Sequence, residues 1–380
     1  MKNFIEINFF SKKFLYIIFL GLFELIRSLF TKYFLNDYYC PFFMNFLMFC
    51  GEATLIIFYF IEKKLLSKLS RKKGKIIFNQ TGITNNISKL NQTITLFLEN
   101  QKIKIKKHND IFFIFICMLG DYISFLFQTI SKITGYPLCV RDLYILISMF
   151  FCYYLLKFRY YKHHIFSVIL VAIGIIIKFI IQILSEKNIL IWLIGLLIIV
   201  GYISMAIQEC LEKKIIHYDY FNPNLLVSIE GFMGMFVSLF IIIFTMRIKD
   251  KNYNDEITIY FRLNIYNDKK KIIYLIIYYF LNIVVNFFRI KVIYEFDPCH
   301  KTVCYILVDI LRTIINIKNE NENKNFYYYF ISYPFTLIGF LIFNELIIVK
   351  LFNLHYNTNK YINKRSNLDN LNYNNNYICN

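Results

Sequence analysis

Long apolar segments recur along the whole sequence, and they constrain the fold more than any other feature. About 20 apolar residues cross the hydrocarbon core of a bilayer as one helix. Hydrophobic residues make up 57% of the chain and charged residues only 18%, whereas a soluble chain is about 25% charged. The sequence therefore predicts an all-α membrane protein with ten transmembrane helices, at residues 14–32, 42–60, 111–130, 138–157, 165–183, 189–209, 223–246, 272–290, 301–317 and 327–349.

The positions of lysine and arginine predict which side of the membrane each loop faces, because cytosolic loops carry an excess of these residues. With the N-terminus in the cytosol, 26 of the 43 fall on cytosolic segments and 12 on the opposite side, and the rest lie in or at the ends of spans. We therefore expect both termini in the cytosol. The membrane is expected to be that of an intracellular organelle, although the charge count orients the chain without naming its membrane. The lysines and arginines of the loops then account for the net charge of +18, and no nucleic-acid partner is expected.

Proline positions indicate two related halves. Four of the five prolines, Pro41, Pro137, Pro223 and Pro298, stand at the starts of the second, fourth, seventh and ninth spans, where a missing N–H costs nothing. Two five-helix repeats would match the second span to the seventh and the fourth to the ninth. An odd number of spans per repeat inverts one repeat in the membrane, an architecture that recurs among transporters.

The predicted organisation follows from these halves. It comprises a cytosolic N-tail (1–13), a first five-helix repeat (14–183) containing a disordered cytosolic loop (61–110), a second repeat (189–349) and a cytosolic Asn-rich tail (350–380).

Ionisable side chains inside the spans are the candidate functional residues. A charged group at the bilayer centre costs roughly 2.5–3.5 kcal/mol or more, so it usually marks a substrate or ion pathway, or is paired. From the rise per helical residue, Glu24, Glu52 and Asp121 lie near the midplane, and Arg141 and Arg312 lie toward the non-cytosolic face.

A purely structural role is the alternative for each of these groups. Glu24 with Arg27, and Asp309 with Arg312, are spaced i, i+3, which suits pairing within one helix. Lys178 is expected to extend to the membrane interface.

Patterns for other chemistry are missing from the sequence. No P-loop, HExxH or Ser-His-Asp pattern occurs. His163 and His164 lie in a basic loop and are expected to be interfacial. The nine cysteines have no metal-ligand spacing and are expected to act as small buried hydrophobes. We therefore expect no enzyme activity, no cofactor and no metal site.

Several motifs support a family resemblance. They are "CPFFMNFLMFCGE" (40–52), "GD" (120–121), "VRD" (140–142), "AIQECLEKK" (206–214), "NPNLLVSIEGFMG" (222–234) and "LVDILRTII" (307–315). In this order they resemble the drug/metabolite transporter superfamily, and most closely the F-type members of solute carrier family 35. The resemblance implies an EamA-like fold of ten helices in two inverted repeats. It also implies alternating-access transport of a metabolite, by exchange or by proton coupling.

The family's polar positions fall on specific residues of this sequence. They are Glu52, Asp121, Arg141, Gln208, Glu212, Glu230, Asp309 and Arg312. Asp142 stands where the family often has glycine.

These observations together predict a secondary active transporter of a small polar or anionic organic metabolite. Substrate binding is expected from Arg141, Arg312, Asp121 and Asp309, and coupling or cavity lining from Glu52, Glu230, Glu24 and Gln208. The expected partners are the metabolite, the lipid bilayer, and protons or a counter-substrate, and a homodimer remains open. The alternatives are a non-transporting receptor or scaffold that keeps the fold and, more remotely, a polytopic enzyme such as an acyltransferase.

Overall fold

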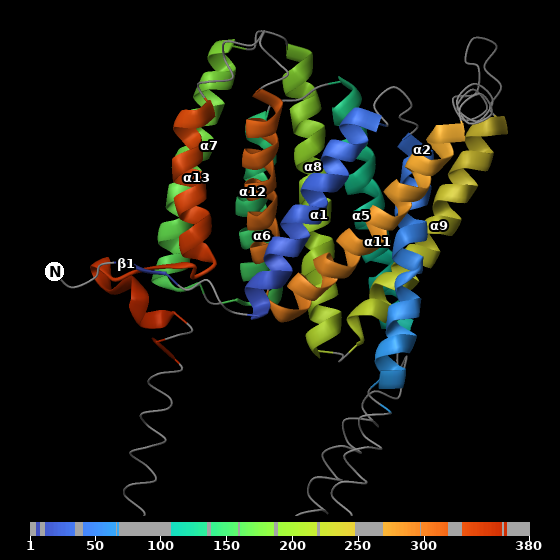
Figure 1. Cartoon of the computed structure of the whole chain (residues 1–380), viewed down its shortest axis with the longest axis horizontal. Coiled ribbons are helices and arrows are strands. Elements are labelled where there is room, and N and C mark those ends of the chain that lie inside the picture. Colours follow the sequence, from blue (N-terminus) through green and yellow to red (C-terminus); the bar gives the residue numbers. More distant parts are fainter. Residues whose placement is uncertain are drawn as a thin grey trace, which may run out of the picture. The chain divides into compact units, whose positions relative to one another are not determined.

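The computed structural model describes residues 5–7, 12–34, 41–65, 67, 108–134, 138–158, 160–185, 189–218, 221–247, 269–296, 298–317, 329–358 and 361–362. Apart from two short strands, these residues form helices and their connections (Figure 1). Each predicted span overlaps a helix. In chain order these helices are α1 (Lys12–Phe34), α2 (Pro41–Ala53), α5 (His108–Thr134), α6 (Leu138–Leu156), α7 (Lys162–Ser185), α8 (Ile189–Tyr218), α9 (Pro223–Arg247), α11 (Lys269–Glu295), α12 (Pro298–Ile317) and α13 (Tyr329–Phe343).

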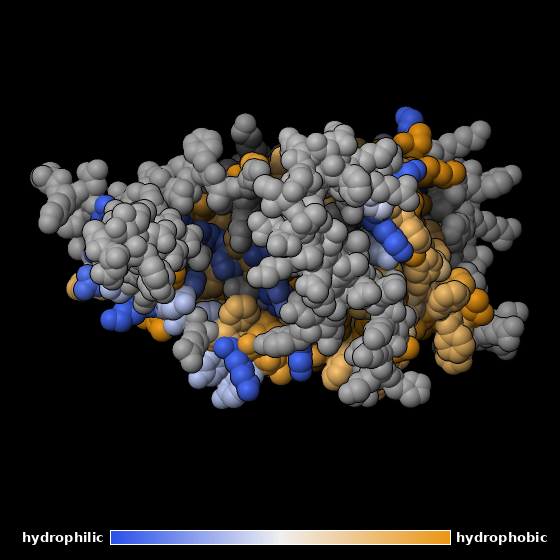
Figure 2. All heavy atoms as spheres, turned by 90° about the horizontal axis from the view of Figure 1, so that it is seen from below, coloured by the Kyte–Doolittle hydropathy of each residue, from blue (hydrophilic) through white to orange (hydrophobic). Residues whose placement is uncertain are grey.

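Several of these helices are suited to a membrane. Among the described residues, five segments are long and apolar enough to cross one: Phe42–Leu65, Lys162–Leu184, Trp192–His217, Pro223–Phe244 and Lys270–Glu295. Large hydrophobic side chains on them are exposed, such as Phe236 and Phe240 on α9, and Figure 2 shows exposed apolar side chains on one face. Such exposure is costly in water but not in lipid. The expectation of an all-α protein with several membrane-spanning helices is therefore supported.

Prolines begin helices where the sequence predicts. Pro41, Pro223 and Pro298 are the first residues of α2, α9 and α12. At α9, the Asn222 side-chain oxygen accepts hydrogen bonds from the backbone N–H groups of Asn224 (3.0 Å) and Leu225 (3.2 Å). An asparagine cap followed by proline at the first helical position fixes a helix start. This cap sets the register of α9 and hence the place of its glutamate.

The chain divides into two compact units, of which unit 1 comprises residues 1–25, 135–199 and 298–380. In this unit α6 packs against α12 and α7 against α13. Glycines allow the close approach of α7 and α13: a Cβ at Gly174 would meet the Thr336 methyl group at 2.6 Å, and one at Gly339 would meet the Ser167 carbonyl oxygen at 2.9 Å. The Ser167 hydroxyl donates to the Gly339 carbonyl at 2.5 Å, across the same contact.

Unit 2 comprises residues 26–134 and 200–297. Its central helix is α2, which packs against α5, α9 and α11. The contact with α9 is the closest, because a Cβ at Gly231 would lie 2.3 Å from the backbone nitrogen of Ala53 and 2.7 Å from the carbonyl carbon of Glu52. Gly234, one turn further, packs on the ring of Phe49. The two backbones therefore touch beside Glu52.

The structure departs from the predicted boundaries at the end of the tenth span. Helix α13 stops at Phe343, and residues 347–349, expected to be helical, form strand β2 (Ile347–Val349). This strand pairs antiparallel with β1 (Ile5–Ile7), within the predicted N-tail. A 3-10 helix, Leu351–Asn357, follows at the start of the predicted Asn-rich tail. The polar residues Asn344 and Glu345 end the helix before its apolar sequence does.

Lys213 on α8 holds the end of α11 in unit 2. Its buried ammonium donates to the backbone carbonyls of Ile293 (2.7 Å), Tyr294 (2.9 Å) and Phe296. The last carbonyls of a helix have no partner within the helix, and a cation there also complements the helix dipole.

We expect Lys213→Met to lower the free energy of unfolding in detergent by roughly 1.5–3 kcal/mol, the range for hydrogen bonds to charged groups. Lys214→Met is the matched control, because Lys214 is the next residue and is exposed. It is expected to change stability by less than about 0.5 kcal/mol. Equal losses from the two variants would contradict the role given to Lys213.

Candidate functional site

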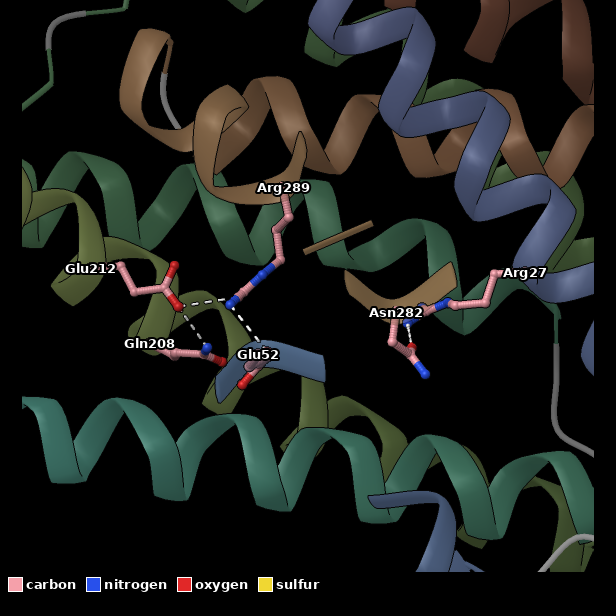
Figure 3. Close-up of polar contacts among 6 residues, drawn as sticks. All are labelled: Arg27, Glu52, Gln208, Glu212, Asn282 and Arg289. Carbon is pink, nitrogen blue, oxygen red and sulfur yellow. Dashed lines mark hydrogen bonds and ion pairs between the residues drawn. The ribbon is translucent and has the colours of Figure 1, made fainter. Parts of the chain in front are cut away.

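Four helices of unit 2 bring buried polar side chains together. Glu52 ends the apolar run of α2, and Glu230 lies two turns into α9. Gln208 and Glu212 are four residues apart on α8, so they share one face of the helix. Arg289 projects from α11 toward them (Figure 3).

Arg289 is the centre of this group. Its Nη1 lies 3.1 Å from Glu212 Oε1 and its Nη2 lies 3.5 Å from Glu52 Oε1. The Gln208 amide donates to the same Glu212 oxygen at 2.8 Å. Glu52, Gln208, Glu212 and Arg289 are all at most 5% exposed. The guanidinium thus links carboxylates from two helices that are distant in the sequence (Figure 3).

Two further carboxyls complete what we call the Arg289 cluster: Arg289 with Glu52, Asp121, Glu212 and Glu230. Glu230 interacts electrostatically with the other four members, yet neither of its oxygens makes a hydrogen bond to a described residue. Asp121 on α5 interacts with Glu52 and is only half-buried. It is therefore the least enclosed member of the cluster.

The charges of the cluster do not balance. Four carboxyls share one guanidinium, so full ionisation would leave excess negative charge in a buried place, which is costly. Replacing a buried ion pair by packed apolar residues is often neutral or stabilising, so stability alone gives little reason to keep this cluster. Chemically, the arrangement is suited to take up protons or a cation.

A second polar contact lies two turns away on α11. Arg27 Nη1 donates to Asn282 Oδ1 at 2.9 Å, and Asn282 donates to the Tyr278 carbonyl at 3.0 Å. Asn286, between Asn282 and Arg289, is buried as well. Figure 3 shows the Arg27–Asn282 contact beside the Arg289 cluster. Helix α11 therefore presents a continuous polar stripe to the interior of unit 2.

The structure brings together four of the predicted site residues, Glu52, Asp121, Gln208 and Glu230. Glu24 is buried on the part of α1 that belongs to unit 1. The other predicted residues lie on α6 and α12, two helices of unit 1 that pack together. Their side chains lie outside the described residues: Arg141, Asp309 and Arg312.

Sequence reasoning missed the central residue, Arg289. Glu212 entered only through the family resemblance. A signal for Arg289 was present, since Asn282, Asn286 and Arg289 are spaced i, i+4, i+7 in an otherwise apolar segment. That spacing places all three on one face of a helix.

One expectation for unit 1 needs correction. Lys178 does not extend to an interface: it is 4% exposed, with its Nζ 4.8 Å from the centre of the Tyr333 ring. The ring of His163, in the first turn of α7, is enclosed by protein, at 2% exposed. Both side chains are enclosed by the close packing of α7 and α13.

Comparison with known proteins adds no family assignment. No protein-family model matches the chain, and no curated protein matches it significantly. The similarity to the drug/metabolite transporter superfamily stays a prediction from short motifs.

Proposed function

We propose that the protein is a secondary active transporter, which moves a small polar or anionic organic metabolite across a membrane by alternating access. The observation that carries the proposal is the Arg289 cluster, a buried group of carboxyls in excess over their cation. Four of its five members, all except Asp121, lie in segments long and apolar enough to cross a membrane. Ionisable groups in such segments generally serve substrate, ion or proton pathways.

Helix packing supports the inverted-repeat arrangement within this proposal. The second predicted span contacts the seventh (α2 with α9), the fourth contacts the ninth (α6 with α12) and the fifth contacts the tenth (α7 with α13). These pairs are the ones that two matching five-helix halves would form. The pairing of β1 with β2 also favours an even number of crossings, since it joins the N-terminal segment to the segment after α13.

Within the proposed mechanism, the Arg289 cluster couples transport to protons or to a counter-substrate. Glu230 is the natural proton acceptor, since its carboxyl is enclosed and makes no hydrogen bond to a described residue. Arg289 is held by two glutamates and is less available for an anionic substrate. Arg141 and Arg312 remain the proposed substrate contacts.

The test is transport by the purified full chain in proteoliposomes. We expect counterflow of a labelled compound from a panel of nucleotide sugars, sugar phosphates, amino acids and peptides. An inward proton gradient should raise accumulation of that compound by up to about tenfold per pH unit for each coupled proton, because one unit is worth about 1.4 kcal/mol. The proposal fails if no compound of the panel exchanges and none moves protons, and a receptor or scaffold would then be favoured.

Glu230→Gln separates coupling from transport. We expect this variant to lose the stimulation by the proton gradient and to keep counterflow, because the amide matches the carboxyl in shape but cannot exchange a proton. Glu62→Gln is the matched control, since Glu62 is a partly exposed carboxylate of the same unit, 2.7 Å from Lys291. Full stimulation in Glu230→Gln would remove Glu230 from the coupling step.

A further inference from the structure

Two histidines and a glutamate meet at one end of unit 1, far from the Arg289 cluster in sequence. His163 and His164 lie in the first turn of α7, and Glu345 lies two residues beyond the end of α13. Donor atoms of the three side chains all lie within 4.8 Å of one another. The close packing of α7 on α13 brings the residues together, although about 180 residues separate them in the chain.

The imidazole of His163 is buried and makes no hydrogen bond to a described residue, although Glu345 lies within ion-pair distance. His163 is 2% exposed. Its Nε2 faces Glu345, 3.4 Å from Oε1. Buried polar groups nearly always have a partner, and each exception calls for an explanation. A cation held between the imidazole and the carboxylate supplies one.

Glu345 stands where a glycine would be expected. The Leu346 N–H donates to the Leu341 carbonyl at 2.9 Å and the Glu345 N–H to the Ile342 carbonyl at 3.0 Å. This is the Schellman pattern of helix ends, in which the left-handed residue is usually glycine. Glu345 takes that place with φ 56°, at a cost of roughly 1–2 kcal/mol. Its side chain is directed toward His163, so a role for that side chain explains why the strained residue is not glycine.

We propose that His163, His164 and Glu345 form a binding site for a divalent transition-metal ion, with Zn²⁺ as the first candidate. Two imidazoles and one carboxylate are a common zinc ligand set, which leaves one position for water or another ligand. Ligand bonds of about 2.0–2.2 Å in tetrahedral geometry place donor atoms roughly 3.3–3.6 Å apart. The His163–Glu345 separation of 3.4 Å already fits.

The third ligand needs a small adjustment. His164 Nδ1 accepts a hydrogen bond from the Tyr161 backbone N–H at 3.3 Å, and metal binding through this ring would replace or redirect that contact. His164 and Glu345 are each partly exposed, so an ion has access. Once bound, the ion would link the start of α7 to the turn that follows α13.

The test is zinc binding by the purified full chain after removal of metal with EDTA. We expect about one Zn²⁺ per chain by elemental analysis and a rise of the unfolding temperature on adding Zn²⁺, because an ion that binds only the folded state stabilises it. Co²⁺ in place of Zn²⁺ should give visible absorption bands, and X-ray absorption should report nitrogen and oxygen neighbours. No bound zinc, or sulfur neighbours from a cysteine site, would overturn the proposal.

The variant Glu345→Gly distinguishes the proposed role of the Glu345 side chain as a metal ligand from the role of its backbone at the end of α13. Glycine relieves the left-handed strain, so we expect this variant to be as stable as the parent, or more so, without metal. It should nevertheless lose zinc affinity by more than about 100-fold, since even indirect partners of a metal site contribute 10- to 100-fold. His163→Ala should lose affinity to a similar extent. His355→Ala, on the 3-10 helix outside the three-residue group, should keep it. Zinc binding unchanged in a folded Glu345→Gly variant would contradict the assignment.

Discussion

Replacing Arg289 with methionine is expected to lower the free energy of unfolding by about 3–5 kcal/mol, the loss typical when one partner of a buried ion pair is removed. The change leaves Glu52 and Glu212 without their cation, and both are at most 1% exposed. The measurement is equilibrium unfolding in mixed micelles, followed by tryptophan fluorescence or circular dichroism. Transport in proteoliposomes should be lost in the same variant.

A double-mutant cycle distinguishes lost attraction from general damage. Combining Arg289→Met with Glu212→Gln removes one of the carboxylates left without its cation, so we expect the double variant to recover roughly 0.5–3 kcal/mol relative to additivity. Lys291→Met is the control on the same helix. Its partner, Glu62, is partly exposed, and such a pair contributes at most about 1 kcal/mol. A loss below 1 kcal/mol for Arg289→Met would mean that the cluster is not held by this cation.

Gly231→Ala is expected to be the most damaging single-methyl change in unit 2. The added carbon would lie 2.3 Å from the Ala53 nitrogen and 2.7 Å from the Glu52 carbonyl carbon. These are backbone atoms, so the clash is relieved only if α2 and α9 move apart. We expect a loss of about 3 kcal/mol or more, at the upper end of the range for overpacked cores. Transport should also fall, because separating the helices moves Glu52 relative to Arg289.

Two other glycines calibrate this result. At Gly234 the added carbon would meet the side chain of Phe49 rather than backbone, so the loss should be smaller. At Gly21 the nearest atom is a Val308 methyl carbon at 3.8 Å, an ordinary contact. Gly21→Ala should be neutral or stabilising by about 0.5–1 kcal/mol, because alanine favours the helix. A Gly231→Ala variant as stable as Gly21→Ala would exclude the close α2–α9 contact.

Local sequence signals predicted the positions of the helices and most of the carboxyl side chains in the Arg289 cluster. The apolar runs place each predicted span on a helix, although α8 extends nine residues past its predicted end and α13 stops six residues short. Pro41, Pro223 and Pro298 mark helix starts. Glu52 and Glu230 stood out because a carboxylate in an apolar segment needs an explanation wherever the segment packs. These signals are contained within a single helix, so no knowledge of its neighbours was required.

Pairings between distant segments could not be predicted in this way. Arg289 falls within the predicted span 272–290, but its pairing with Glu212 depends on how α8 and α11 pack. The burial of His163 could not be predicted either, since a basic flank does not reveal that the packing of α7 on α13 encloses this ring. The helix end at Glu345 was hidden for another reason: the apolar sequence continues to residue 349, and a residue other than glycine adopts the left-handed conformation there.

During synthesis, β1 is made about 340 residues before the strand with which it pairs. At roughly 5–20 residues per second, the first strand waits about 15–70 seconds for its partner. Throughout that time its backbone N–H and C=O groups need other partners, such as water or the polar surface of the membrane. The pairing forms only after α13 has been made, so it is among the last steps in the assembly of unit 1.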